Sequence, residues 1–471
     1  MRCVVLTVIM ASAIATAQES ALHADFRLWS GRVGEACGTL AFKTIESCPY
    51  TLFTDHPLHI AVGSIAPQNG IGFGPAFVTH YTPNESWRLT WNFDAIGSTN
   101  ASWRAGGYMK IIHTPPVKIV VKPAPTKPGE KPTKPKLAVH PYTVFNVFAQ
   151  SISLNKLYFF GLGPDTLPAG RSVFGEQQTI VGGNVIKPIT EWSAIRGLNL
   201  ALLGEVNGRF VSLRGNHGES SPSIEQLYNE ATAPGLTTQP AFVQLGEGVR
   251  LKPTLFNDHL QLNYLGTFQQ FFAPSASRYS FRRWGVDLTH TVPLYSQTQS
   301  SGARDTNGPN ECAQALGAEK CPPVSVSRNR SGAVAFRFLL SESATSTPSV
   351  VPFYLQPTLG GTNINGFPAL SSYQDYRFRG PNLILFRESF EHSIWGPFGF
   401  SFMADQGKVA LTRGDIGFDN LKHSFSAGLT LRAGGFPEVS VMYAWGGGEG
   451  QHTTFNLNTS LLGGGGRPSL Y

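Results

Sequence analysis

The sequence predicts an all-β protein, a transmembrane antiparallel β-barrel of about 16 strands, an even number as bacterial barrels have. Apolar and polar residues alternate along many short segments, because a wall between lipid and water needs side chains of opposite kind on its two faces. Only 14% of the residues are charged, whereas glycine (51) and phenylalanine (32) are abundant. No segment beyond the first residues approaches the ~20 apolar residues of a membrane-spanning helix.

The N-terminus has the pattern of an export signal, which we expect to cover residues 1–17. Arg2 supplies the positive charge, Cys3–Ile14 is apolar, and Ala15-Thr16-Ala17 is a cleavage site of the A-x-A type. We therefore expect export and residence in the bacterial outer membrane. Residues 18–66 are then expected to form a short periplasmic segment that precedes a barrel over residues 67–462.

The remaining cysteines form two close pairs, Cys37 with Cys48 and Cys312 with Cys321. Even, local pairing in an exported chain suggests two small disulfide loops. Neither pair has the C-x-x-C spacing of a zinc site and no histidine cluster lies beside them, so no metal is expected.

Strand by strand, the alternation is clearest where aromatic residues recur. Trp87, Leu89, Trp91 and Phe93 alternate with polar neighbours that include Asp94. The predicted strands are, in order, 71–81, 87–97, 102–113, 143–161, 173–186, 198–213, 241–255, 259–272, 279–294, 324–340, 350–358, 382–394, 398–404, 424–433, 438–445 and 453–462. Their closure into a cylinder requires that the first and last strands meet.

A soluble β-sandwich is the alternative, because it shows the same two-residue period. Two features favour the barrel. Large aromatics recur near strand ends, as an interfacial girdle requires. The opposite face carries Arg, Asp, Asn and Gln, which a dry sandwich core would not accept unpaired.

Residues 114–141 interrupt the pattern with six lysines among many prolines. Nucleic-acid binding is one interpretation of such a run. A solvated, extended loop is favoured because prolines break the run throughout, so no nucleic-acid partner is expected. With a periplasmic N-terminus, this loop and the Cys312–Cys321 loop are predicted on the outer side of the membrane.

The stretch from Pro357 to Ala410 carries a family resemblance. It reads as a strand, a loop rich in Gly, Asn and Arg, and two further strands, of which the second ends in Phe402-Met403-Ala404-Asp405-Gln406-Gly407. This layout resembles the barrel domain of the Omp85 superfamily (bacterial surface antigen D15, the BamA/TamA group). The resemblance implies a long loop before the twelfth strand that turns into the lumen.

The resemblance also implies a loop lock and a gate. Leu370–Tyr373 matches the loop tip of the family, but Ser371 stands where the family has arginine, and Asp405 matches the acid that this arginine meets. We expect Arg377 or Arg379 to replace it as the partner of Asp405, with Tyr373 and Gly407 beside them; a solvated, unpartnered Asp405 is the alternative. Gly70, Gly72 and Gly74 are assigned to the first strand, where they would weaken its pairing with the last strand.

Two departures from the family accompany these matches. The residues before the first predicted strand are too few for a POTRA domain, and residues 463–471 form a Gly-rich tail after the last strand. The sequence also lacks G-x-S-x-G, H-E-x-x-H and P-loop motifs, so no enzyme and no cofactor are expected. His259, His290 and His423 could serve a hydrolase site, but isolated histidines of a polar lumen are the favoured interpretation.

The resemblance implies a role in the assembly, insertion or translocation of polypeptide or lipid at the outer membrane. A passive pore or structural barrel is the alternative, and the missing loop arginine and missing POTRA domain favour it. The expected partners are outer-membrane lipid, lipopolysaccharide and client polypeptides, and the barrel is expected to be monomeric.

Overall fold

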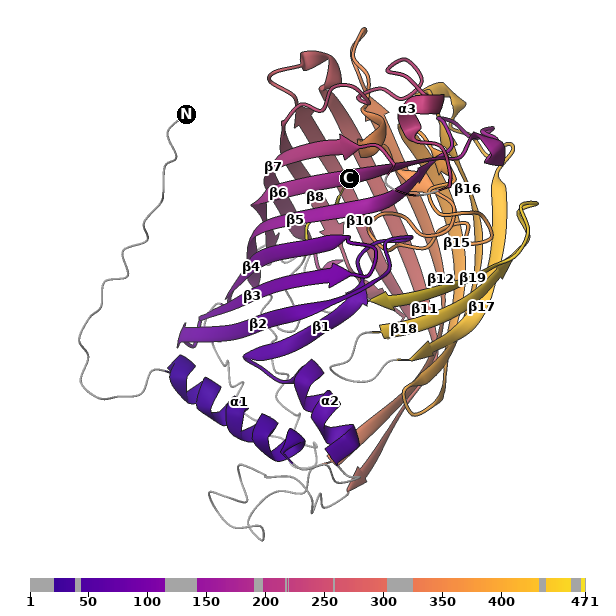
Figure 1. The fold of residues 1–471 in the computed structure, drawn as a ribbon. Coiled ribbons are helices and arrows are strands. Elements are labelled where there is room, and N and C mark those ends of the chain that lie inside the picture. The colour runs from indigo at the N-terminus through magenta and orange to yellow at the C-terminus, as the bar shows by residue number, and fades with distance from the viewer. Residues whose placement is uncertain are drawn as a thin grey trace, which may run out of the picture.

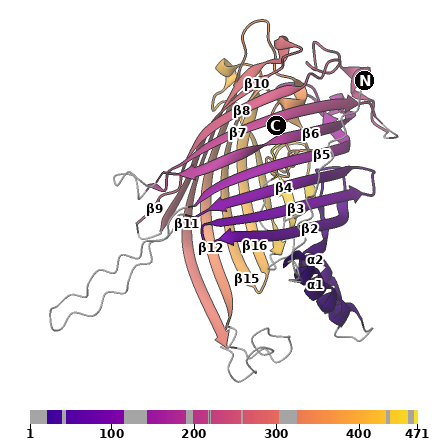
Figure 2. The same ribbon diagram turned by 90° about the vertical axis from the view of Figure 1, so that its left-hand side faces the viewer.

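The structure, a computed structural model, describes residues 21–38, 44–114, 142–189, 198–216, 218, 220–256, 259–302, 325–431, 438–458 and 467–470. Sixteen strands of this part of the chain form a nearly closed antiparallel barrel, in which each strand pairs with its neighbour in sequence (Figure 1). The predicted fold class is therefore confirmed. A view at right angles shows the same continuous wall (Figure 2).

The barrel strands begin at β1 and end at β19. Their bounds are β1 Leu58–Ser64, β2 Ile71–Asn84, β3 Trp87–Ser98, β4 Trp103–His113, β5 Thr143–Phe159, β6 Ser172–Pro188, β7 Ala201–Arg214, β8 Phe242–Leu251, β10 Leu260–Phe272, β11 Phe281–Gly302, β12 Ser325–Ala344, β15 Asn382–Trp395, β16 Phe398–Ala410, β17 Lys422–Leu431, β18 Glu438–Trp445 and β19 His452–Asn458. A two-residue strand, β9 (Thr254–Leu255), adds to the edge of β10.

Two strand predictions were wrong. One barrel strand was missed and one was predicted that does not exist, so the predicted total of sixteen strands is unchanged. Strand β1 lies inside the segment 18–66 that was expected to precede the barrel. It was missed because its inward face carries only His59, Ala61 and Gly63, so polar and apolar residues hardly alternate along it. Conversely, residues 350–358 form no barrel strand but a 3-10 turn, η5 (Phe353–Leu355), between prolines that lack the N–H of a ladder.

This exchange changes the barrel end at which the described strands begin and end. Since β1 comes first, the end of β4 and the start of β5 lie at the barrel end where the chain enters β1. The chain also leaves β11 and enters β12 at this end. The strand ends that border residues 114–141 and the Cys312–Cys321 stretch therefore lie on the side of the N-terminal helices, not on the opposite side as predicted, and the stretches themselves lie outside the described residues.

The wall of the barrel has the predicted alternation. In β3, Thr90, Asn92 and Asp94 are buried inside the barrel, whereas Trp91 and Phe93 are exposed outside. Large apolar side chains cover the outer face from many strands, among them Phe73, Phe210, Trp284, Phe336, Leu429, Val441, Tyr443 and Phe455. Such a surface suits hydrocarbon rather than water.

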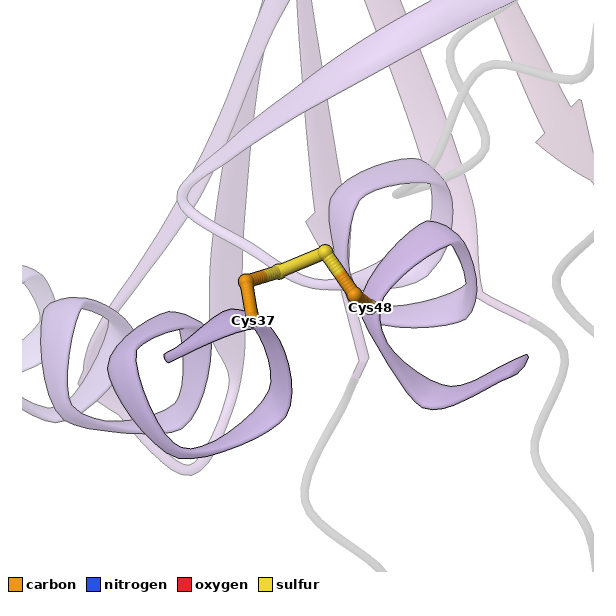
Figure 3. The surroundings of a disulfide bond; sticks show 2 residues. All are labelled: Cys37 and Cys48. Carbon is orange, nitrogen blue, oxygen red and sulfur yellow. A yellow bond between two sulfur atoms is a disulfide. The ribbon is translucent and has the colours of Figure 1, made fainter. Parts of the chain in front are cut away.

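Two helices precede the barrel, α1 (Ala21–Cys37) and α2 (Thr44–Thr54). The predicted disulfide between Cys37 and Cys48 joins them (Figure 3). Arg32 of α1 also forms two hydrogen bonds to Asp55, at 2.7 and 3.0 Å, just before β1. The described residues ahead of β1 therefore form a braced helix pair and no strand.

No helix in the described ranges combines the length and the apolar character needed to cross a bilayer.

Several predictions lie outside the described residues. These are the signal peptide of residues 1–17, nearly all of the Lys- and Pro-rich stretch, the pairing of Cys312 with Cys321, and the glycines at 463–466.

Candidate functional site

A long loop, residues 345–381 between β12 and β15, packs against the inner face of the barrel; we call it the luminal loop. Phe353 of this loop is fully buried, with ring centroids 5.0 Å from Phe159 of β5 and 5.3 Å from Phe174 of β6. Tyr354 and Leu355 join the same apolar cluster. The luminal loop therefore contributes buried apolar side chains to a cluster that it shares with β5 and β6.

Asp405 of β16 anchors the luminal loop. Its carboxylate accepts two hydrogen bonds from Arg387 of β15, at 2.7 and 2.9 Å, and both side chains are more than nine-tenths buried. The same carboxylate accepts the N–H of Leu370 at 2.8 Å, and Arg387 also donates to the carbonyl of Pro368. Because both charges are satisfied by each other and by loop backbone, the pair holds the loop at a fixed place on the wall.

The expected partners of Asp405 were wrong. Arg377 instead forms an ion pair with Glu449 at 2.8 Å, and Arg379 donates to the carbonyl of Phe353 at 2.8 Å. Arg387 stands directly opposite Asp405 in the β15–β16 ladder, so it reaches the carboxylate with no loop rearrangement. A β-bulge between Ser393 and Trp395 shifts the register by one residue, so counting straight back from the turn would have placed Glu388, not Arg387, opposite Asp405.

A second aromatic contact involves Phe367 of the luminal loop. The guanidinium of Arg337 lies 4.3 Å from its ring centroid and that of Arg387 lies 4.7 Å away. Arg337 is itself held by Asp287 through hydrogen bonds of 2.8 and 2.6 Å. The ring thus sits between two fixed cations, a contact that sequence reasoning missed.

Tyr373 and Gly407 both lie at places of close packing. The Tyr373 ring contacts Phe378 edge-on at 5.0 Å, and a Cβ at Gly447 would lie 2.5 Å from it. Burial, followed by the nearby Glu449 carboxylate, raises the pKa of Tyr373. A Cβ at Gly407 would lie 2.6 Å from the carbonyl oxygen of Ile384, so only glycine fits there.

Ser371, which replaces the family's arginine, is buried, and the N–H of its neighbour Ser372 donates to Ser424 at 2.8 Å. Asp375 connects the luminal loop to the β1–β2 turn through Gln68 at 2.6 Å. Burial raises the pKa of Asp375, and the hydrogen bonds from Gln68 and from the Thr362 N–H oppose this rise. The loop is thus held by backbone contacts and by carboxylates, without the arginine at its tip.

The predicted gate glycines are not on the first strand. Gly70 lies in the β1–β2 turn with φ +76°, and Gly72 and Gly74 lie on β2. Strand β2 pairs with β1 on one side and with β3 on the other, so these glycines do not face the last strand. A Cβ at Gly74 would lie 2.0 Å from the carbonyl oxygen of Ala95, which makes it a residue of the β2–β3 contact.

The junction of β1 and β19, which we call the seam, differs from every other strand contact of the barrel. The two strands lie side by side, but no backbone ladder joins them among the described residues (Figure 1). The described hydrogen bond between them runs from the N–H of Leu457 to the Ser64 hydroxyl at 3.3 Å. The seam is therefore the weakest closure in the described wall.

A cavity of about 1120 Å³ lies inside the barrel at the seam. Its lining comes from the β1–β2 turn, the inner faces of β4, β5 and β12, the luminal loop, β19 and the residues Arg467–Leu470. Within the described residues, no group of three or more His, Cys, Asp or Glu side chains is placed to hold a metal ion. The features that this site offers are a cavity, a weak strand junction and a fixed loop.

Comparison with solved structures agrees with the fold. CdiB from Escherichia coli superposes with a TM-score of 0.50 at 10% identity, over 85% of this chain and 62% of that chain. BamA from Haemophilus ducreyi lacking POTRA domains 1–3 gives 0.47 at 11% identity, over 85% and 69%. No protein-family model matches the sequence, and comparison with curated proteins finds no significant relative. The likeness to CdiB is therefore one of fold.

Proposed function

We propose that the protein is an outer-membrane barrel of the Omp85 type that inserts or translocates polypeptide or lipid through an opening at the seam. The observation that carries the proposal is the contrast between the seam and the two ladders beside it. Strand β1 forms seven register pairs with β2, and β19 forms seven with β18. Only the bond between Leu457 and Ser64 is described across the seam.

The packed interior supports this proposal over a passive pore. The luminal loop contributes buried side chains to two apolar clusters, one around Phe353 and one around Leu370. Asp405 of the wall accepts the N–H of Leu370, and Arg387 of the wall donates to the carbonyl of Pro368. These buried contacts hold the loop backbone and oppose a swing of the loop as a solute passes. The cavity is lined by β19 and the β1–β2 turn, so an opening of the seam would connect it to lipid while the luminal loop stays in place.

A disulfide tether across the seam tests the proposal. Ser64→Cys with Leu457→Cys would join the two strands where they already touch, and oxidation should abolish complementation of a depletion strain, with recovery on reduction. The matched control is Val439→Cys with Leu457→Cys, which links directly opposite residues of the β18–β19 ladder. A seam tether that leaves complementation intact contradicts a lateral opening.

Two further measurements define the activity. Depletion of the protein, followed by comparison of the outer-membrane proteome and lipids, should show loss of client proteins or altered lipid. An unchanged membrane would contradict an assembly role. In planar bilayers, a plugged barrel should give brief, irregular openings, whereas a steady large conductance would identify a passive pore.

A further inference from the structure

The residues Arg467–Leu470, which follow the barrel and which we call the post-barrel segment, lie inside the lumen. Arg467 donates to the carboxylate of Asp94 on β3 at 2.8 Å. The Asp94 side chain is fully buried, and Arg104 of β4 lies 3.4 Å from the same oxygen. The other carboxylate oxygen of Asp94 has no hydrogen-bond partner among the described residues. Asp94 is therefore a buried anion that the barrel presents to a cation entering the lumen.

Backbone atoms of the post-barrel segment are also recognised. Arg209 of β7 donates to the carbonyl of Ser469 at 2.8 Å, and Gln178 of β6 donates to the carbonyl of Leu470 at 3.2 Å. Asn365 of the luminal loop accepts the N–H of Leu470 at 2.8 Å. Arg209 and Gln178 are both almost fully buried. Because these contacts address the backbone, they would accept many sequences in an extended conformation.

The side chain of Leu470 is buried and belongs to the apolar cluster that fills the lumen. The post-barrel segment therefore sits in a groove with three kinds of recognition: an anion for a basic side chain, donors and an acceptor for backbone, and an apolar end. We call this groove the luminal groove. The segment also lines the seam cavity, so its removal would join the luminal groove to that cavity.

We propose that the luminal groove is a peptide-binding site, which the post-barrel segment occupies in cis and which a client polypeptide occupies when the segment leaves. The ligand class is an extended peptide with a basic residue three positions before an aliphatic one, as Arg467 stands to Leu470. The client part of the proposal rests on the proposed function. The groove itself rests on the contacts of Asp94, Arg209 and Gln178.

Because the post-barrel segment belongs to the same chain as the luminal groove, it competes with any client peptide for that groove. Eight residues separate Asn458, the last residue of β19, from Arg467. A ligand joined to its site through so few residues of the same chain is presented at an effective concentration on the order of millimolar. A client must therefore either bind more tightly than the segment or arrive at a barrel whose seam has opened and pulled the segment away.

The test measures binding of a fluorescent peptide, Gly-Arg-Pro-Ser-Leu-Tyr, to detergent-purified protein. The variant that lacks residues 467–471 should bind the peptide saturably, and the full chain should bind it at least about tenfold more weakly because the groove is filled. Asp94→Asn in the shortened variant should weaken binding about tenfold, since a charge-assisted hydrogen bond is lost. Heat-modifiable gel migration of each variant confirms a folded barrel.

Two controls separate recognition from general loss of charge. A peptide with glutamine in place of arginine should bind the shortened variant about tenfold more weakly, yet bind its Asp94→Asn form with no further loss. Glu342→Gln removes an acid of a different ion pair, with Arg413, and should leave peptide affinity unchanged. Equal binding of a scrambled peptide, or no binding to the shortened variant, overturns the proposal.

The outcome is independent of the proposed function. Peptide binding needs no insertion assay, so the luminal groove stands even if depletion leaves the outer membrane unchanged. Conversely, a seam tether that stops complementation supports the proposed function even if the peptide fails to bind.

Discussion

The β15–β16 wall and the seam are both contacts between adjacent antiparallel strands, but they are built differently. Strands β15 and β16 share thirteen register pairs and a buried ion pair, Arg387 with Asp405. The seam shows one hydrogen bond, from Leu457 to Ser64, among the described residues. The difference follows from chain connectivity, because β15 and β16 are joined by a short turn whereas β1 and β19 meet only when the whole barrel closes.

The comparison teaches where the stability of this barrel lies. The Asp405 pair fixes both a wall and the luminal loop, so a change there should affect two structures at once. Among the described residues, no ion pair joins β1 to β19, so the described part of the seam can open without breaking a buried charge contact. The predictions below test this division, from the largest expected effect to the smallest.

Arg387→Ala should cause the largest loss. It leaves the Asp405 carboxylate buried without its cation, which costs about 3–5 kcal/mol of unfolding free energy. Urea unfolding of the barrel in detergent measures the loss, and protease digestion should cut the luminal loop faster. Cells that carry the variant should also become sensitive to large antibiotics.

The matched control is Arg413→Ala. Arg413 pairs with Glu342 at 2.8 Å, but its side chain is 56% exposed. An exposed pair contributes roughly 0–1 kcal/mol, so stability should hardly change. Equal losses for the two variants would show that burial of the Asp405 pair has no special role.

Gly407→Ala should have an intermediate effect. Its new Cβ would meet the carbonyl oxygen of Ile384, which is backbone and has little room to move. Overpacking of this kind costs about 1–3 kcal/mol. Gly266→Ala is the control, since nothing lies within 4 Å of a Cβ there. The urea midpoint should fall for the first variant only.

Acidification should loosen the loop between β7 and β8, and its effect on stability should be smaller than that of the substitutions above. Burial would raise the pKa of Glu230, but hydrogen bonds from Tyr279, Gly235 and Thr237 together lower it below its usual value of 4.5. A lowered folded pKa contributes stability that is present above about pH 4.5 and lost as pH falls through the folded value.

Amide hydrogen exchange at Gly235 and Thr237, corrected for intrinsic rates, measures this effect. Protection should drop on acidification in the native protein. In Glu230→Gln it should be low and independent of pH, because the neutral amide loses no proton. A native loop whose protection does not change below pH 4 would contradict the assignment.

The sequence predicted the barrel because the wall is a repeated local pattern, as Trp91 and Phe93 against Asn92 and Asp94 illustrate. It missed β1, whose inward residues His59, Ala61 and Gly63 give little polar alternation. It also predicted a strand at 350–358, whose apolar residues pack in the lumen instead. The prediction of the residue that pairs with Asp405 was wrong for a different reason. It depends on register across a turn, and the nearest arginine in space is not the one that the family pattern suggests.

The position of the post-barrel segment inside the lumen could not be predicted from the sequence. Its contacts join Arg467 to Asp94, and Ser469 to Arg209, across more than half of the chain. Nothing local in the sequence marks such pairs. Only the closed barrel brings the inner faces of β3, β6 and β7 to one groove.

Amide hydrogen exchange of the barrel in lipid bilayers tests the central claim most directly. If the seam is the weak closure, amides of β1 and β19 that point toward it should exchange on the order of 100-fold faster than those of β15 and β16. Protection of β1 and β19 equal to that of β15 and β16 would contradict the account.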